Sequence, residues 1–404
     1  MKVVIAPGSF KESLSAREAA AHIAAGIRDV LPRAEVVCVP MADGGEGTVE
    51  ALVDATDGRY VRCTVTGPLG DGVRARFGIL GDGGTAPGSG DACVVPASSR
   101  KGGRTAVIEM ASASGLALVP PRHRNPLVTT TFGTGELIRA ALDRGVRKIL
   151  IGIGGSATVD GGSGMAQALG VKLLDARGHG IPSGGGGLAK LDRIDMSGLD
   201  PRVKSRRVGI EVACDVRNRL TGKTGAARVY GPQKGATPGQ VRILDKALAR
   251  LAEVIRRDLG VDVGRLPGSG AAGGLGAGLV AFLGARLRSG GEMVLEAVDL
   301  AGKMQRAEIV ITGEGRLDRS SAYGKTPMGV AQTAVKLGIP VVALVGSVGE
   351  GAHEVLHRGI DAYFTILGGP VTLDQAFREA PESLRRCAAQ VMRLFLAGRR
   401  KFDR

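Results

Sequence analysis

The segment KILIGIGGSATVDGGSGMAQALG, residues 148–170, joins an apolar strand to a helix through a loop of glycines, hydroxyl groups and one aspartate. Lys148 to Ile153 is a short apolar run, typical of a sheet covered on both faces, and a helical pattern begins at Met165. Glycines let backbone N–H groups approach a ligand closely, and the helix presents its positive end to the same place. The segment therefore predicts an α/β fold with a loop that binds phosphate or carboxylate. The candidate anion-binding residues of this loop are Gly154, Gly155 and Ser156.

Both ends of the chain repeat this pattern of strand, glycine-rich loop and helix. Residues 3–6 and 35–41 are predicted strands, with a helix near residues 15–30 between them. Residues 308–312 and 341–345 are predicted strands near the other end. Because strand–helix–strand units of this kind build parallel sheets, we expect both ends to form one doubly wound sheet. A second domain would then be inserted between them, with a cleft at the carboxyl ends of the strands.

The middle of the chain has a mixed pattern. Residues 62–80 and 105–109 have the pattern of antiparallel strands, and residues 81–104 between them are rich in Gly, Ser and Pro, which predicts a mobile loop. A chain of 404 residues fits two domains of ordinary size. The predicted limits are 1–60 together with 287–404 for the doubly wound domain, and 61–286 for the inserted mixed α/β domain.

The net charge of +15 raises the question of a nucleic-acid partner. The basic residues are scattered along the chain, Trp is absent and aromatic residues make up 3%, so no stacking platform is predicted. We therefore expect no nucleic-acid partner, and a positive field would instead attract a small anionic substrate. The five widely spaced cysteines contain no Cys-x-x-Cys pair, which is typical of a reducing compartment rather than of a disulfide framework or a zinc site. The first apolar run is too short for a signal peptide, and no segment is long enough to span a bilayer, so the expected location is cytoplasmic.

Two motifs point to other functions on a first reading. Gly268, Gly270 and Gly273 have the spacing of a dinucleotide-binding fingerprint, but Pro267 precedes them and no convincing strand does. A nicotinamide-dependent oxidoreductase is therefore a weak alternative. The segment His353–His357 matches the zinc-protease signature, but no third histidine lies downstream to complete the metal site.

Acidic residues beside glycines collect at the predicted strand ends. They are Asp43, Glu46, Asp160, Asp215, Glu314 and Asp318. Six carboxylates at one cleft repel one another unless a cation lies among them, and Mg²⁺ with nucleotide phosphates is such a cation. Lysines in glycine-flanked or loop positions could neutralise phosphate oxygens, and these are Lys11, Lys234 and Lys325.

Eight segments together give the chain a family resemblance. They are APGSFKESLSA from Ala6, MADGGEGT from Met41, RNPLVTTTFGTGELI from Arg124, IGIGGSATVDGGSGMAQALG from Ile151, ACDVRNRL from Ala213, YGPQKGAT from Tyr230, GSGAAGGLGAGL from Gly268 and TGEGRLD from Thr312. In these segments the chain resembles the type I glycerate kinase family along nearly its whole length. Arg219 departs from the family pattern, which usually has proline there, and Arg319 with Ser320 replaces a usual Gln-Thr pair.

The resemblance implies a flavodoxin-like domain made from both chain ends, and transfer of the γ-phosphoryl group of ATP to D-glycerate with Mg²⁺. The product would be 2-phosphoglycerate, with 3-phosphoglycerate as the alternative. The sequence leaves the oligomeric state open, with a homo-oligomer as one candidate. The substrate- and phosphate-binding candidates are Gly154, Gly155, Ser156, Asn218, Lys234, Asp43, Glu46 and Lys325. The catalytic candidates are Lys11, Asp160 and Asp215, where either aspartate could accept the hydroxyl proton, and the metal candidates are Glu314 and Asp318.

Overall fold

Both ends of the chain meet in one five-stranded parallel sheet. The computed structural model describes residues 1–42, 44–45, 47–81, 103–322 and 326–402. The strands of this sheet are β1 (Lys2–Pro7), β2 (Glu35–Cys38), β11 (Ile309–Leu317), β12 (Val341–Val348) and β13 (Ala362–Thr365). Their order is β13-β12-β11-β1-β2, and every neighbouring pair is parallel. This is the flavodoxin-like order, so the prediction of a doubly wound sheet from both chain ends is confirmed.

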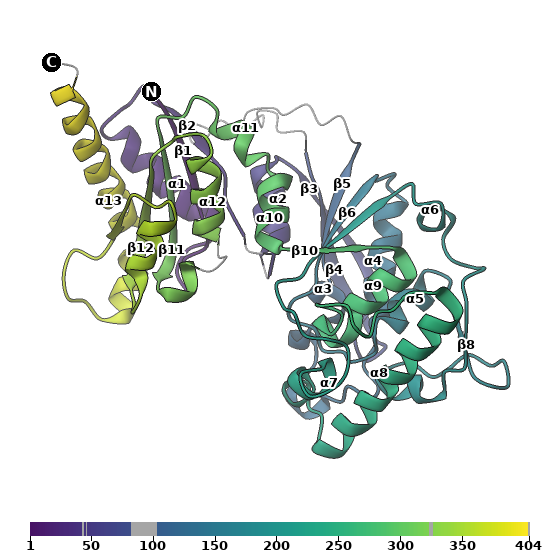
Figure 1. Cartoon of the computed structure of the whole chain (residues 1–404). Coiled ribbons are helices and arrows are strands. Elements are labelled where there is room, and N and C mark those ends of the chain that lie inside the picture. The colour runs from purple at the N-terminus through teal and green to yellow at the C-terminus, as the bar shows by residue number, and fades with distance from the viewer. Residues whose placement is uncertain (43, 46, 82–102, 323–325, 403–404) are drawn as a thin grey trace.

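Helices cover both faces of the five-stranded sheet (Figure 1). Alternate residues of β1 point to opposite faces, as a strand requires. Val3 and Ile5 pack with α1 (Ala16–Arg28) and α13 (Leu373–Phe402), whereas Val4 and Ala6 pack on the other face, with α12 (Thr326–Val335). A capping box is present at the start of α1, because Ser15 accepts a hydrogen bond from the Glu18 N–H and the Glu18 carboxylate accepts one from the Ser15 N–H.

The central part of the chain forms a six-stranded mixed sheet. Its strands are β3 (Arg59–Thr66), β4 (Gly72–Ile79), β5 (Thr105–Glu109), β6 (Lys148–Gly152), β9 (Gly209–Ala213) and β10 (Arg286–Arg288), in the order β10-β9-β6-β5-β4-β3. The predicted antiparallel pairing holds for β3 with β4 and for β4 with β5. Strand β5 also pairs in parallel with β6, so it joins the antiparallel edge to the parallel part of the sheet.

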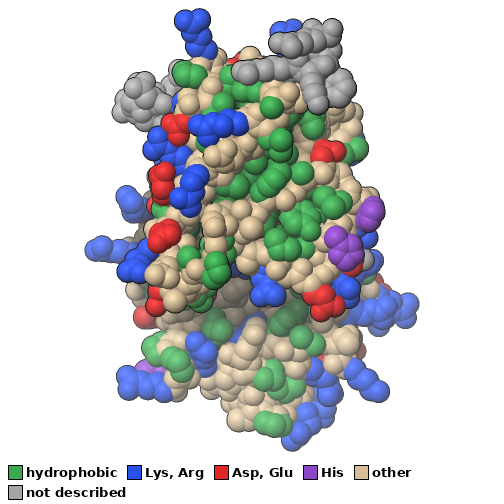
Figure 2. Space-filling view, turned by 90° about the vertical axis from the view of Figure 1, so that its left-hand side faces the viewer, with side chains coloured by type: hydrophobic (Ala, Val, Ile, Leu, Met, Phe, Trp, Pro, Cys, Tyr) green, Lys and Arg blue, Asp and Glu red, His purple; other side chains and the backbone are tan. Residues whose placement is uncertain are grey.

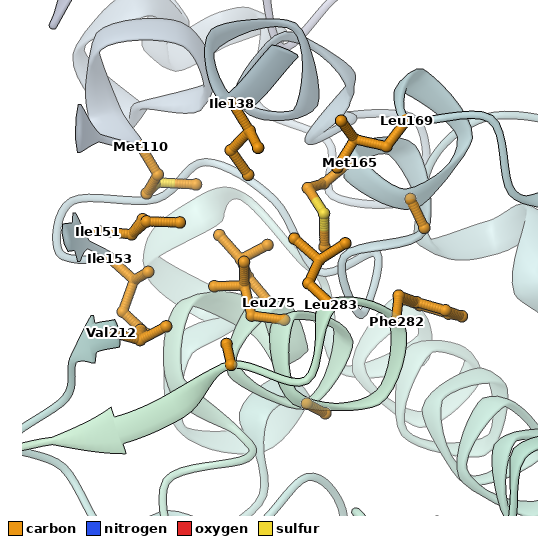
Figure 3. Packing of buried hydrophobic residues seen from close by; sticks show 14 of the residues in the cluster. Met110, Ile138, Ile151, Ile153, Met165, Leu169, Val212, Leu275, Phe282 and Leu283 are labelled. Atoms are coloured by element: carbon orange, nitrogen blue, oxygen red, sulfur yellow. The ribbon is translucent and has the colours of Figure 1, made fainter. Parts of the chain in front are cut away.

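Helices and a small hairpin surround this second sheet. The α-helices are α3 (Ala111–Ser114), α4 (Phe132–Leu142), α5 (Ser163–Ala168), α6 (Pro201–Lys204), α7 (Ala226–Tyr230), α8 (Pro238–Leu259) and α9 (Leu275–Leu283), and the hairpin pairs β7 (Lys172–Leu174) with β8 (Arg193–Asp195). Figure 3 shows how Ile151 of β6 and Val212 of β9 pack with Met165 and Leu275 from two of these helices. The anion-binding loop is therefore anchored on a buried hydrophobic core.

Three helices connect the two sheets. They are α2 (Thr48–Ala55), α10 (Gly290–Ala297) and α11 (Leu300–Met304). One hydrophobic cluster contains residues of both sheets, including Val4 of β1 and Leu150 of β6, together with Leu52 of α2 and Val294 of α10. The helices α2 and α10 thus lie between the sheets (Figure 1). The domain limits given above stay a prediction, and so do the homo-oligomer and the cytoplasmic location.

Short 3₁₀ helices complete the chain. They are η1 (Leu116–Leu118), η2 (Pro121–His123), η3 (Gly185–Lys190), η4 (Pro232–Lys234), η5 (Ala271–Gly274), η6 (Arg319–Ala322) and η7 (Ala352–Arg358). The zinc-protease-like segment falls in η7, between β12 and β13. Within the described residues, no helix is both long and apolar enough to cross a membrane. The predicted mobile loop lies almost wholly outside the described residues.

One sequence expectation about this fold was wrong. Strand β11 does not end at Thr312 but continues through Leu317, so that Glu314 pairs with Val345. A Cβ on Gly313 would lie 2.2 Å from the carbonyl oxygen of Leu344, so this glycine allows two strands to approach closely and does not begin a loop.

Candidate active site

A cavity of about 550 Å³ lies where the carboxyl ends of strands from both sheets meet. The six-stranded sheet contributes the loops after β6 and β9, and the segments around η4 and η5 close the same side. Gly44 and Gly45 after β2, and Ser320 after β11, contribute from the other sheet. Figure 2 views the molecule from the side of the five-stranded sheet. In this view the surface is hollowed between the upper and the lower part of the molecule, and Lys and Arg side chains lie at the rim of the hollow.

The glycine loop after β6 forms one wall of this cavity. Gly154, Gly155 and Ser156 all line it. The Leu116 N–H donates to the Gly155 carbonyl oxygen at 2.7 Å, so the neighbouring chain holds the loop in place. Gly155 has φ of +70°, a conformation that favours glycine. The loop is thus a rigid, exposed stretch of backbone with one hydroxyl group, as an anion site requires.

Asp160 follows this loop but does not line the cavity. Its side chain is fully buried, and its carboxylate accepts four hydrogen bonds, from the N–H groups of Thr131, Gly162 and Gly164 and from the Thr131 hydroxyl. Burial raises the pKa of the Asp160 carboxyl, and these four donors oppose that shift. The geometry shows a residue that braces the start of α5.

Lys234, at the end of η4, lines the cavity although it is almost completely buried. Its Nζ donates to Ser156 Oγ at 2.6 Å and to the Thr158 carbonyl oxygen at 2.7 Å. Burial lowers the pKa of Lys234 to about 7, and the charge of Asp160 opposes this shift. The lysine thus places its amino group directly behind the hydroxyl of the glycine loop.

Asp215 lies in the loop directly after β9 and is exposed on the cavity wall. Its Oδ1 accepts a hydrogen bond of 3.0 Å from the N–H of Gly290, the first residue of α10. Gly44 packs against the same place, because a Cβ on Gly44 would lie 2.6 Å from the Gly290 Cα. The orientation of Asp215 therefore depends on how the connecting helix α10 meets the loop after β2.

Several cavity residues were not among the sequence candidates. Tyr230 lines the cavity, and its hydroxyl donates to Asn218 Oδ1 at 2.8 Å, while Asn218 Nδ2 donates to the Thr224 carbonyl oxygen. Asn218 itself is not a lining residue, so it acts on the cavity through Tyr230. Ala272 is another lining residue and has φ of +53°, a left-handed conformation uncommon for alanine. The motif YGPQKGAT contained Tyr230 and the motif GSGAAGGLGAGL contained Ala272, but neither residue was singled out as a site candidate.

The remaining candidates lie away from this cavity or outside the described residues. Lys11 is exposed in the turn after β1, and its backbone N lies 3.4 Å from the position of a Cβ on Gly315 in β11. Lys11 thus follows β1, and Glu314 lies in the adjacent strand β11, at the point where the strand order of the sheet reverses. Asp43, Glu46 and Lys325 lie outside the described residues.

The two metal candidates have different surroundings. Asp318 Oδ1 accepts hydrogen bonds from the Ser320 N–H and hydroxyl, and its Oδ2 lies 3.6 Å from Arg316 Nε. Glu314 lies within β11, whereas Asp318 follows the carboxyl end of that strand, which is the edge where ligands of this fold bind. The described residues contain no group of three His, Cys, Asp or Glu side chains that could hold a metal ion. Protein ligands alone therefore do not form a metal cage in this part of the chain.

Comparison with known proteins gives a consistent result. The sequence profile of the glycerate kinase family matches residues 3–396. The chain is 52% identical to a glycerate kinase of Bacillus subtilis (strain 168) over 97% of both proteins. It is 51% identical to a glycerate 2-kinase of Escherichia coli (strain K12), covering 99% of both. A crystal structure of a candidate glycerate kinase 2 from Salmonella typhimurium LT2 superposes with a TM-score of 0.85, at 51% identity over 99% of both chains. The chain belongs to the glycerate kinase family.

Proposed function

We propose that this protein transfers the γ-phosphoryl group of ATP to a hydroxyl group of D-glycerate and forms 2-phosphoglycerate. One observation carries the proposal: an exposed glycine loop, a buried lysine and an exposed aspartate line one cavity, in a chain about half identical to a glycerate 2-kinase along nearly its whole length. A kinase needs to bind phosphate and carboxylate and to position a hydroxyl group. These three features supply those needs.

The residues of the cavity divide these tasks. The backbone of Gly154 and Gly155 binds a phosphate or carboxylate, because N–H groups of such a loop and the nearby helix end favour negative charge. Ser156, supported by Lys234, donates its hydroxyl to the same anion. Asp215 accepts the proton of the substrate hydroxyl, since it is exposed in the cavity and holds only one backbone donor. Asp160 is saturated with hydrogen bonds and has no access to substrate.

Mg²⁺ belongs to this proposal as a companion of ATP. Its chemistry, when it is bound, is to neutralise charge on the phosphate oxygens. The described part of the chain offers single carboxylates and no three-residue cage, which suits an ion held by one or two carboxylates and by phosphates. Glu314 and Asp318 are the candidates for this role, and the carboxylate of Asp318 also contacts Arg316 and Ser320. Lys11, on the turn beside Glu314, is placed to contact the phosphates.

The test is an assay of the purified protein with ATP, Mg²⁺ and D-glycerate. Coupling to enolase detects 2-phosphoglycerate, and adding phosphoglycerate mutase reveals any 3-phosphoglycerate. We expect product with enolase alone, and loss of activity in excess chelator with recovery on adding Mg²⁺. Product that needs the mutase would assign the 3-position instead, and the absence of both products would reject the proposed function.

A further inference from the structure

Lys234 is a buried lysine without a salt bridge among the described residues, and it faces a cavity. Its side chain is almost fully buried, and both of its hydrogen-bond partners, the Ser156 hydroxyl and the Thr158 carbonyl oxygen, are neutral. A buried ammonium group usually requires a carboxylate partner, because losing water destabilises the charged form. The cavity beside Lys234 is the place where such a partner can enter.

Among the residues that the structure describes, the carboxylate whose charge acts on Lys234 is that of Asp160. Asp160 does not contact Nζ, because its oxygens already accept the four hydrogen bonds described above. The other titratable groups around the lysine are Asp215, Cys214 and Tyr230 on the cavity wall, and Arg124, whose backbone lies against Gly235. The Arg124 guanidinium donates to the Val119 carbonyl oxygen. None of these groups forms an ion pair with Lys234 within the described part of the chain.

We propose that Lys234 takes up a proton when the anionic group of a ligand enters the cavity. Binding of an anion is then coupled to protonation of the lysine. This inference rests on the proposed function of the same site. In the empty protein, burial holds the pKa of Lys234 at about 7, so near neutral pH a large share of the molecules carry a neutral amine. A carboxylate or phosphate a few ångströms away favours the ammonium form and raises that pKa.

The hydrogen bond between Lys234 and Ser156 explains how protonation of the lysine affects the ligand. An ammonium group can only donate, so Ser156 Oγ then acts as the acceptor and its own O–H is free to point to the ligand. A neutral amine can accept that O–H instead and withdraw it from the cavity. Protonation thus turns the Ser156 hydroxyl toward an anion. It also makes Lys234 unavailable as a base during phosphoryl transfer, which leaves Asp215 for that role.

Isothermal titration calorimetry measures this proton directly. D-Glycerate and, separately, inorganic sulfate are titrated into the whole protein, each in two buffers of different ionisation enthalpy. Both probes are fully ionised between pH 6 and pH 8, so neither contributes a proton. We expect uptake of more than about half a proton per bound anion at pH 8, and close to none at pH 6, where Lys234 is already charged. The variant Lys234→Met should bind without this uptake.

The matched control is Lys303→Met. Lys303 is also a buried lysine that donates to a carbonyl oxygen, that of Ala55, but it does not line the cavity. Its loss should leave proton uptake unchanged. Anion binding without uptake in the wild-type protein, uptake that persists in Lys234→Met, or failure of both probes to bind would overturn the inference. Sulfate-linked uptake with no phosphorylation of D-glycerate would keep the inference and reject the proposed function instead.

Discussion

Two aspartates in the central part of the chain differ in what surrounds their carboxylates, and this difference predicts opposite phenotypes. Asp215 is exposed and accepts one backbone hydrogen bond. Asp215→Asn keeps the shape of the side chain and removes the proton acceptor. We expect turnover to fall by about a hundredfold or more, with little change in ATP affinity or in melting temperature. Wild-type turnover in this variant would remove Asp215 from the mechanism.

Asp160→Asn should instead act on stability. The Asp160 carboxylate accepts hydrogen bonds from four donors in a fully buried position, so an amide N–H₂ must face at least one of those donors. We expect the free energy of unfolding to fall by about 2 kcal/mol or more, as measured by urea denaturation. The folded fraction should keep near-normal affinity for ATP. A stable Asp160→Asn protein without turnover would contradict this assignment.

Lys234 predicts how stability depends on pH. Its pKa is about 7 in the folded protein and 10.5 in a free lysine, so between these values the unfolded chain binds a proton that the folded chain lacks. The free energy of unfolding therefore rises with pH between these two values, by up to about 1.4 kcal/mol per pH unit. This gain is lost as the pH falls through 7, where the lysine of the folded chain becomes protonated as well. Urea denaturation at pH 7, 8 and 9 should show this rise in the wild-type protein relative to Lys234→Met. Parallel curves would show that Lys234 titrates normally.

The sequence could predict the glycine loop but could not separate the two aspartates. Gly154, Gly155 and Ser156 were candidates because glycines after a strand have a direct structural meaning, and all three line the cavity. Asp160 and Asp215 are both acids that follow a predicted strand, so the sequence pattern left either of them as the possible proton acceptor. Their burial is decided by residues distant in the chain, such as Thr131 for Asp160 and Gly290 for Asp215. Only the tertiary structure brings these donors into place.

At the scale of elements, the presence of a parallel sheet built from both chain ends was predictable, and the lengths of its strands were not. Apolar runs separated by helical patterns identify a parallel sheet, which the structure confirms. Gly313 and Gly346 suggested that β11 and β12 end early, yet both strands continue past these glycines. A glycine in a sequence can indicate either a loop or a place where two backbones approach closely, and the residue type alone does not distinguish them. The position of Glu314 within a strand could therefore not be read from the sequence.

A glycine in α4 provides a test of the helix packing behind the anion-binding loop. A Cβ on Gly135 would lie 2.4 Å from the Met165 carbonyl oxygen and 2.6 Å from the Ala168 Cβ, both in α5. Gly135→Ala should therefore push α5 away and lower the free energy of unfolding by about 1–3 kcal/mol. The control is Gly209→Ala in β9, where a Cβ meets open space and φ is not positive. Equal stability of the two variants in urea denaturation would contradict this packing.

At the scale of the whole molecule, the cavity depends on how the loop after β2 meets the helix that connects the sheets. Gly44 has φ of +89° and lies on Gly290, whose N–H holds Asp215. A Cβ on Gly44 would lie 2.6 Å from the Gly290 Cα and 3.0 Å from the Ala213 Cβ. Gly44→Ala must therefore shift the loop or α10. The sequence marked this glycine as part of a motif, but not its contact across the molecule.

Gly47→Ala is a matched control for that contact, because it separates backbone strain from a clash. Gly47 has φ of +86°, close to that of Gly44, but a Cβ there meets nothing within 4 Å. Both variants should lose about 1 kcal/mol of stability from the left-handed conformation. Only Gly44→Ala also displaces Gly290 and with it Asp215, so we expect its turnover to fall at least about tenfold further than that of Gly47→Ala. Steady-state kinetics with D-glycerate and ATP measure this difference. Equal turnover in the two variants would mean that Asp215 keeps its position without Gly44, and that the two sheets can shift without disturbing the site.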